Sequence, residues 1–170
     1  METDRKYMLD TASKIRLLQN LARAWDGQWY IKTAEQFGTD QATALNETVG
    51  KSIQRIVARM SLKAWKKEKA VDFEDAGRMI RGLFDWSQGH FWMASFEIAK
   101  ESIHIEVARC PFYEGAKQAK LERTDQACVN CTDAWSNWMD TLLPGQKANV
   151  THLSKMSEGS TTCLIHLQKA

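Results

Sequence analysis

The sequence has few of the residues that interrupt regular structure. Only two prolines, Pro111 and Pro144, occur in 170 residues, and no stretch is of low complexity. Disorder is therefore expected only at the extreme termini. No apolar run reaches the roughly 18 residues that a membrane-spanning helix needs. The charged first residues predict neither a signal peptide nor an organelle presequence, so a soluble cytoplasmic protein without a membrane partner is expected.

Several catalytic motifs are also missing. The chain has no G-x-S-x-G elbow, no phosphate-binding loop, no dinucleotide glycine fingerprint and no H-E-x-x-H pair. The net charge is only +2, and basic residues are scattered among acids. The densest basic cluster, around Trp65, suits a solvated helix end, so nucleic acid is not expected as a partner. A homodimer stays open.

Apolar periodicity predicts helices first and a sheet afterwards. Helices are predicted over residues 4–37, from 39 or 40 to beyond 60, and from 73 to 88, with Gly27 interrupting the first. Two strands follow within 91–110, turning at 100–102. Helices over 113–120 and 125–143 and strands over 149–156 and 161–168 complete the chain. This order predicts one α+β domain over 1–170, with a helical part (1–88) and an antiparallel sheet packed against helices (89–170).

Long apolar stripes mark the first two predicted helices. In each, apolar residues recur at steps of three and four and so share one face. The first stripe contains Met8, Ala12, Ile15, Leu18, Ala22, Trp25 and Trp29, and the second contains Leu45, Val49, Ile53, Ile56 and Met60.

Four cysteines carry the strongest chemical signal. Cys128 and Cys131 form a C-x-x-C pair, whose two thiolates can grip one metal ion. Cys110 follows a predicted strand and Cys163 lies in the last one, so all four could form a zinc site or hold an iron–sulfur cluster. Core packing is an equal alternative, because Cys128 and Cys131 share a helical stripe with two tryptophans. A redox disulfide is a third, weaker alternative.

Acid–base candidates are few. His104 and Glu106 share one face of a predicted strand, and either could act as a metal ligand or general base. Asp26 lies beside Trp25 and Trp29, where bulky aromatics would raise its pKa. A solvated sheet face and an exposed Asp26 are the simpler alternatives.

Tryptophan is unusually frequent, with seven residues in the chain. Large flat side chains line either a thick core or a ligand cavity. The candidates for contact with a small-molecule ligand are Trp25, Trp29, Tyr30, Trp92, Trp135 and Trp138.

Several segments together resemble a known family. The motifs that carry the resemblance are Trp25–Tyr30 (WDGQWY), Glu35–Gly38 (EQFG) with Arg59, Arg109–Lys117 (RCPFYEGAK) and Ser157–Cys163 (SEGSTTC). Trp25–Tyr30 and Glu35–Gly38 with Arg59 resemble the helical start of a poorly characterised family of small prokaryotic proteins. Arg109–Lys117 and Ser157–Cys163 resemble the L-2-amino-thiazoline-4-carboxylic acid hydrolase family. Both parts are similar to the broader 4-vinyl-reductase-type, hydrocarbon-binding domains. The resemblance implies a ligand cavity between a small antiparallel sheet and its helices, with a zinc ion nearby held mostly by cysteines. The matching positions are Cys110 and Cys163. Where relatives carry an acid before the Ala-Arg of the second helix, this chain has Val57.

Two functions of different classes follow. A metal-assisted hydrolase of a small heterocycle or amide would use zinc with an open position, while His104, Glu106 or Asp26 moves protons. A non-catalytic sensor or carrier would use a closed four-cysteine zinc site to lock the layers around an aromatic cavity. An iron–sulfur redox protein is a lesser form of the second. The sequence favours small-molecule binding beside a cysteine-bound metal, with hydrolysis as an added role.

Overall fold

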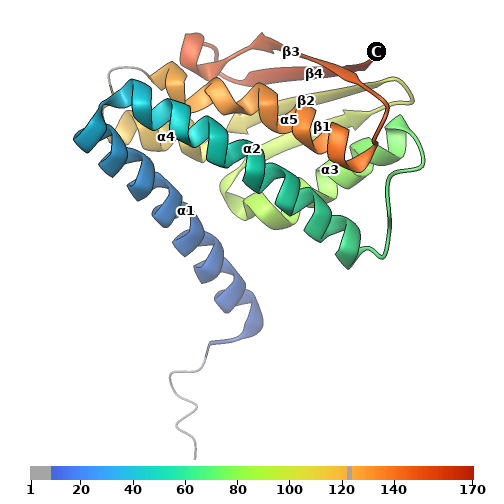
Figure 1. Cartoon of the computed structure of the whole chain (residues 1–170), viewed down its shortest axis with the longest axis horizontal. Coiled ribbons are helices and arrows are strands. Elements are labelled where there is room, and N and C mark those ends of the chain that lie inside the picture. Colours follow the sequence, from blue (N-terminus) through green and yellow to red (C-terminus); the bar gives the residue numbers. More distant parts are fainter. Residues whose placement is uncertain (1–8, 122–123) are drawn as a thin grey trace, which may run out of the picture.

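The computed structural model describes residues 9–121 and 124–170 and confirms the predicted α+β class. Three long helices come first and are followed by strands interleaved with two shorter helices (Figure 1). The elements are α1 (Thr11–Phe37), α2 (Thr39–Ala64), α3 (Phe73–Gln88), β1 (Met93–Ile98), β2 (Ser102–Arg109), α4 (Pro111–Gln118), α5 (Val129–Leu142), β3 (Ala148–Ser154) and β4 (Cys163–Lys169). Short 3₁₀ turns are η2 (Gly89–Phe91), η3 (Thr124–Cys128) and η4 (Met156–Glu158).

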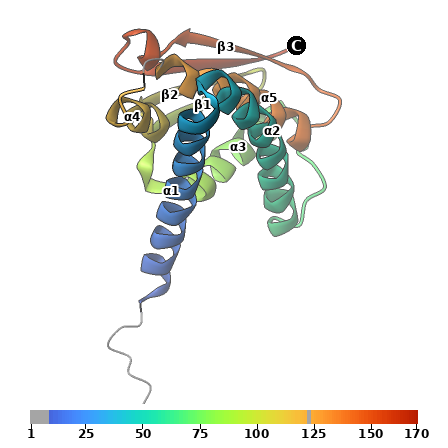
Figure 2. The ribbon, with the colours of Figure 1, turned by 60° about the vertical axis from the view of Figure 1, so that its left-hand side comes forward.

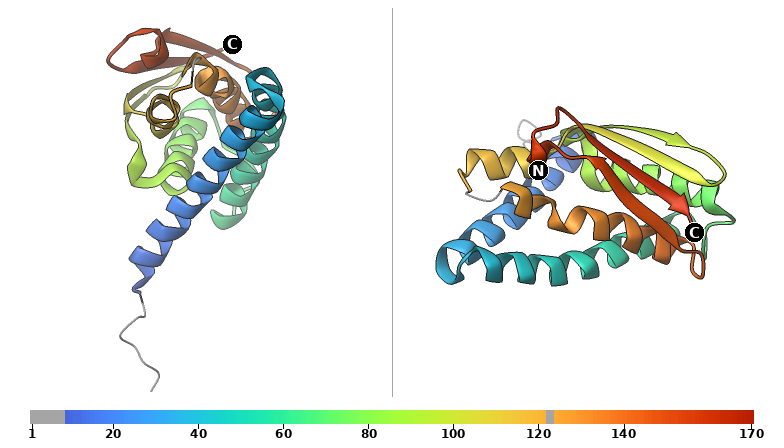
Figure 3. Two further views of the ribbon diagram at one scale, coloured as in Figure 1. Left: turned by 90° about the vertical axis from the view of Figure 1, so that its left-hand side faces the viewer. Right: turned by 90° about the horizontal axis from the view of Figure 1, so that it is seen from above.

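The four strands form one antiparallel sheet in the order β1-β2-β4-β3. Side chains alternate between a buried and a solvent face, as in an antiparallel sheet covered on one side only. On β2, Ile103, Ile105 and Val107 are buried, whereas His104 and Glu106 are exposed. Seen from above, the outer face of the sheet carries none of the helices formed by the described residues (Figure 3).

Helices α3 and α5 cover the inner face, and the core lies between them and the sheet. Ile80 and Leu83 from α3 and Met139 and Leu142 from α5 are completely buried. Helix α3 approaches β1 and β2 so closely that a Cβ on Gly77 would lie 2.8 Å from Ile98 Cγ2. A glycine is therefore needed at this contact.

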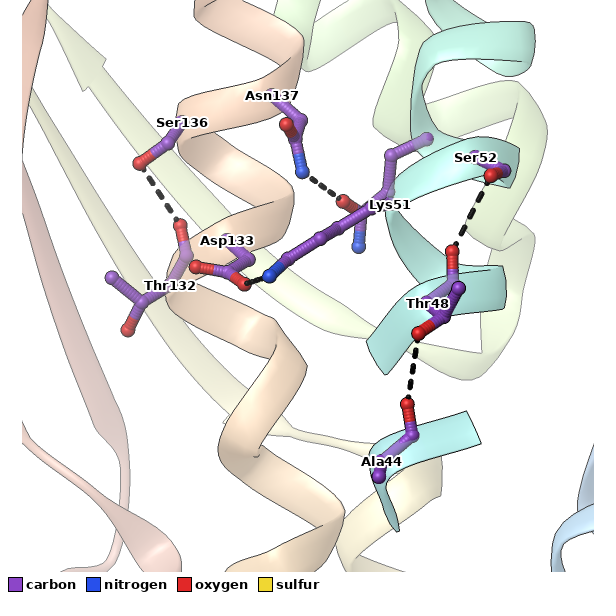
Figure 4. Close-up of polar contacts among 9 residues, drawn as sticks. Ala44, Thr48, Lys51, Ser52, Thr132, Asp133, Ser136 and Asn137 are labelled. Atoms are coloured by element: carbon purple, nitrogen blue, oxygen red, sulfur yellow. Dashed lines mark hydrogen bonds and ion pairs between the residues drawn. The ribbon is translucent and has the colours of Figure 1, made fainter. Parts of the chain in front are cut away.

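Helix α2 forms a third layer on the outer side of α5, where Ala58 and Leu62 join the core and polar contacts add to the packing. Lys51 Nζ lies 2.9 Å from Asp133 Oδ2, and Asn137 Nδ2 donates to Gln54 Oε1 at 2.8 Å (Figure 4). These contacts fix which face of α2 points toward the body of the protein.

Helix α1 diverges from the rest of the chain. It meets α2 at Gly38, whose φ of +91° turns the chain sharply, and Tyr30 Oη lies 3.1 Å from Thr43 Oγ1 near this junction. From there the two helices separate (Figures 1 and 2). Farther along α1, Gln19 Nε2 donates to the Trp86 carbonyl and the Arg23 guanidinium lies over the Phe91 ring.

Two predicted details of the helices were wrong. Gly27 does not interrupt the first helix, because α1 runs without a break and nothing crowds this position. The helix predicted from residue 125 begins instead at Val129, after the 3₁₀ turn η3, so the C-x-x-C pair straddles the junction. The predicted start of the first helix at residue 4 lies outside the described residues.

Candidate functional site

The four cysteines come from separate segments that meet at one end of the molecule. Cys110 directly precedes α4, Cys128 ends η3, Cys131 lies in the first turn of α5, and Cys163 begins β4. All four are free thiols, and Cys110 is buried. The Cys163 sulfur accepts a hydrogen bond from the Met156 backbone N–H at 3.2 Å.

Burial raises the pKa of three of these thiols. The pKa of Cys131 rises to about 12 and that of Cys110 to about 11, mainly because burial penalises the thiolate. Burial also raises the pKa of Cys128, opposed in part by the Ser157 hydroxyl. Negative charge on Cys110, Cys128 and Cys163 raises the pKa of Cys131 further, so the four sulfurs lie within electrostatic reach of one another.

This donor set suits a soft cation such as zinc in its chemistry. Thiolates are the preferred ligands of structural zinc, and a cation would compensate the charge that burial disfavours. As positioned, however, no group of three or more His, Cys, Asp or Glu side chains among the described residues is arranged to hold a metal ion. Ligation would therefore require the side chains to reorient around the ion.

A cluster of aromatic rings lies next to the thiols in the core. Phe84 on α3 is at its centre, with ring centroids 5.2 Å from Trp92, 5.5 Å from Phe96 and 5.8 Å from Trp135. Trp138 continues the cluster edge-on to Trp135 at 5.1 Å. Cys131 and Trp135 are one helical turn apart on α5, and the Trp135 indole acts on Cys131 to lower its pKa. The thiols and the aromatic cluster are thus adjacent.

A groove opens over this cluster at the free edge of the sheet, between α3 and β1. Its volume is about 510 Å³. Phe84, Trp92 and Phe96 line its apolar part, whereas Arg78, Arg81 and Asp85 belong to its polar rim. The floor is therefore aromatic and the rim charged, which is the usual composition of a small-molecule site.

One residue that lines the groove carries a buried polar atom without a partner among the described residues. Trp92 Nε1 is buried and makes no hydrogen bond within the described parts of the chain. An unpaired buried donor costs roughly 1–3 kcal/mol, so a ligand that accepts this hydrogen bond would recover that free energy. Arg78, by contrast, is already paired with Glu74.

The sequence-predicted ligand residues are divided between two places. Trp92 lines the groove, and Trp135 and Trp138 belong to the core beneath it. Trp25 and Trp29 instead project from α1, with 65% and 60% of their surface exposed. The Tyr30 hydroxyl shares a hydrogen bond with Thr43 Oγ1 at the junction of α1 and α2.

The acid–base candidates are also separated. His104 and Glu106 lie on the outer face of the sheet, whereas Cys110, Cys131 and Cys163 join the core on its inner side. Asp26 lies on α1, where partial desolvation raises its carboxyl pKa although the side chain is exposed to solvent. The three residues therefore do not share one site.

His104 stacks on a second histidine, His166, and nothing in the sequence pattern had linked the two residues. The His104 and His166 rings lie 4.3 Å apart and nearly parallel, because the two residues pair across β2 and β4. A shallow depression of about 150 Å³ adjoins them, with Glu97 and Glu106 in its lining. This depression is small and open on the solvent face.

Sequence reasoning missed the groove residues Phe84, Phe96, Arg78 and Arg81. The sequence pattern assigns Phe84 only to the apolar stripe of its helix. The arginines recur three residues apart beside that stripe, which indicates one exposed edge of α3 but not that a groove lies there. Their connection to Trp92 depends on how α3 packs against β1, which no local pattern encodes.

Comparison with known proteins shows the fold alone. No family model and no curated protein sequence matches the chain. The phenol-responsive sensory domain of the transcription activator PoxR, solved with phenol, is similar with a TM-score of 0.56 and 13% identity over 86% of this chain and 73% of that one. Subunit 3 of the trafficking protein particle complex from Naegleria fowleri, covalently bound to palmitic acid, has a TM-score of 0.58 and 12% identity over 91% of this chain and 96% of that one.

These comparisons leave the family of the chain open. The resemblance to the thiazoline carboxylate hydrolase family stays a prediction, since it is not accompanied by a family match. No helix within 9–121 or 124–170 is both long and apolar enough to cross a bilayer.

Proposed function

We propose that this protein binds a small aromatic molecule carrying a hydrogen-bond acceptor, in the groove between α3 and β1. The observation that carries the proposal is an aromatic-floored groove of about 510 Å³ lined by Trp92, whose buried Nε1–H has no partner among the described residues. That volume is within the range of small-molecule pockets.

The groove sets the chemistry of the ligand. Phe84, Trp92 and Phe96 offer ring faces and edges, which favour an aromatic ligand in stacked or edge-on contact. The Trp92 indole can only donate, so the ligand must supply an acceptor such as a hydroxyl or carbonyl oxygen. Arg81 at the rim favours a ligand whose exposed end is electron-rich.

The two similar structures support this assignment as analogies. One is a phenol-responsive sensory domain solved with phenol, and the other is covalently bound to palmitic acid. Because the groove floor is aromatic, a phenol-like ligand suits it better than a long aliphatic chain. The role that follows is that of a sensor or carrier module.

We also propose that zinc, held by the cluster of Cys110, Cys128, Cys131 and Cys163, braces the wall of this site. Such an ion would tie the start of α4, the start of α5 and the start of β4 together. Since α5 carries both Cys131 and Trp135, bracing its first turn would hold the aromatic cluster in place. An iron–sulfur cluster would use the same thiols.

Hydrolysis is not part of the proposal. His104 and Glu106 lie on the opposite face of the sheet from the thiols, and the groove lining contains neither residue. No general base is therefore placed beside the aromatic floor by these predicted residues.

The test is a titration with phenol and with palmitate, followed by intrinsic tryptophan fluorescence and by calorimetry. We expect saturable binding of phenol and a loss of about 5- to 30-fold in affinity in Trp92→Phe, which keeps a ring but removes the donor. The control is Trp25→Phe, which changes an exposed tryptophan outside the groove. Equal affinity in wild type and Trp92→Phe would contradict the assignment.

Metal content is tested separately, by elemental analysis of protein purified without a metal-affinity tag. About one zinc per chain, lost in Cys131→Ser, supports the thiolate site. Protein that contains no metal and has four titratable thiols would contradict the proposed zinc site but would not affect the proposed ligand groove.

A further inference from the structure

The most extensive feature that the proposed function does not use is an apolar surface on α1 and α2. The second predicted stripe, Leu45, Val49, Ile53, Ile56 and Met60, is 47–55% exposed along α2. On α1, Leu18, Trp25 and Trp29 are 60–65% exposed, and further leucines and isoleucines accompany them. The described residues of both sequence stripes are therefore uncovered in the single chain.

Helix α1 packs only weakly against its own chain. Not one of its 27 residues is buried. Helices in proteins are stabilised mainly by packing an apolar face, and isolated helices are marginal in water. Arg23 on Phe91 and Gln19 on the Trp86 carbonyl hold one side of α1, which leaves the apolar side free.

The exposed stripe of α2 is distinct from the face that binds the body of the protein. Gln54 and Lys51 contact α5 through Asn137 and Asp133. The stripe lies on the same side of α2 as Ala42, which is buried near α1. Because α1 and α2 separate beyond their junction (Figures 1 and 2), the remaining apolar residues on that side of α2 are exposed to solvent.

The size of this surface indicates what covers it. Twelve large apolar side chains on α1 and α2 are about half exposed or more. At roughly 80–100 Å² each they offer on the order of 1,000 Å², whereas a stable interface needs about 800 Å² per partner. Monomeric proteins rarely expose a contiguous apolar patch of this extent.

We infer that the α1–α2 surface is the interface of a homodimer, in which a second copy of this chain covers both stripes. The surface must be covered whenever the chain is folded, and a partner of the same sequence is always present at equal concentration. Two hairpins of long helices related by a twofold axis can pack as a four-helix arrangement, with the same patch on both copies. This inference stands independently of the proposed ligand.

The test measures the molecular mass in solution by sedimentation equilibrium on the full chain, with single substitutions in each stripe. Leu18→Glu on α1 and Ile53→Glu on α2 place a charge on side chains that are exposed in the single chain, so folding should persist, as circular dichroism will verify. We expect a dimer for the wild type and a dissociation constant raised by about 30-fold or more in each variant.

The matched control is Leu153→Glu on the outer face of β3, where the leucine is 60% exposed. This variant should remain as dimeric as the wild type. A wild-type chain that is monomeric at micromolar concentration would overturn the inference, and so would a dimer that tolerates both stripe variants. Binding of monomeric wild type to phosphatidylcholine vesicles would assign the surface to a membrane and would also overturn it.

Discussion

Two buried thiols make the stability of the metal-free protein depend on pH in an uncommon direction. The pKa of Cys110 is raised from 9.0 to about 11 and that of Cys131 from 9.0 to about 12, in both cases chiefly by burial. A raised pKa means that the folded state keeps a proton that the unfolded state releases. The free energy of unfolding therefore has its full value below pH 9 and falls as the pH rises above 9.

The magnitude follows from the difference in bound protons. Above pH 9 each unfolded thiol loses its proton while its folded counterpart keeps it, which lowers the free energy of unfolding by about 1.4 kcal/mol per pH unit and per thiol. The slope for Cys110 ends near pH 11 and that for Cys131 near pH 12. At pH 10 the two thiols together should have removed roughly 3 kcal/mol.

The assay is urea unfolding at pH 8, 9 and 10 in the presence of a chelator. Replacing Cys131 by alanine should remove part of the loss between pH 9 and pH 10, because one of the three thiols with a raised pKa is gone. Ser136→Ala, one turn farther along α5, provides a control without a thiol. Equal pH slopes in the wild type and Cys131→Ala would refute the reasoning.

If zinc binds, the loaded protein should instead lose stability on acidification, since protons then compete with the ion.

Three further predictions concern the stability of the helices and their packing. Gly77→Ala should lower the free energy of unfolding by about 1–3 kcal/mol, because the added Cβ would lie 2.8 Å from Ile98. Gly27→Ala should raise the free energy of unfolding by about 0.5–1 kcal/mol, because Gly27 lies in open space on α1 and alanine has the higher helix propensity. Chemical denaturation measures both changes. Trp86→Phe should cost about 1 kcal/mol by the same assay, because Trp86 Nε1 donates to the buried Ser61 hydroxyl at 3.0 Å.

The order of the elements could be predicted because each has a local signature. Alternation around Ile103 and Ile105 marks a half-buried strand, and Asp72 caps α3 by accepting a hydrogen bond from the Asp75 N–H. Gly27 misled the prediction because helix propensity is a weak preference that the flanking residues overrode.

The candidate site could be predicted only in part. The cysteines are conspicuous by type, but their spacing in the chain does not determine that they converge in space. The groove depends on the packing of α3 against β1, which joins Phe84 and Arg81 to Trp92 across the sheet edge. Such contacts link residues without any fixed spacing in the chain, so no periodicity reveals them.

The C-x-x-C stripe shows why one pattern supported two interpretations. Trp135, Trp138 and Leu142 are buried as the core interpretation requires, yet Cys131 on the same stripe lies in reach of three other thiols. Along α5 the environment changes from thiols at the first turn to aromatic rings one turn later. The thiols and the buried aromatic rings are therefore successive parts of one helix face, and a ligand of the sulfurs would lie one helical turn from Trp135, which stacks on the groove residue Phe84.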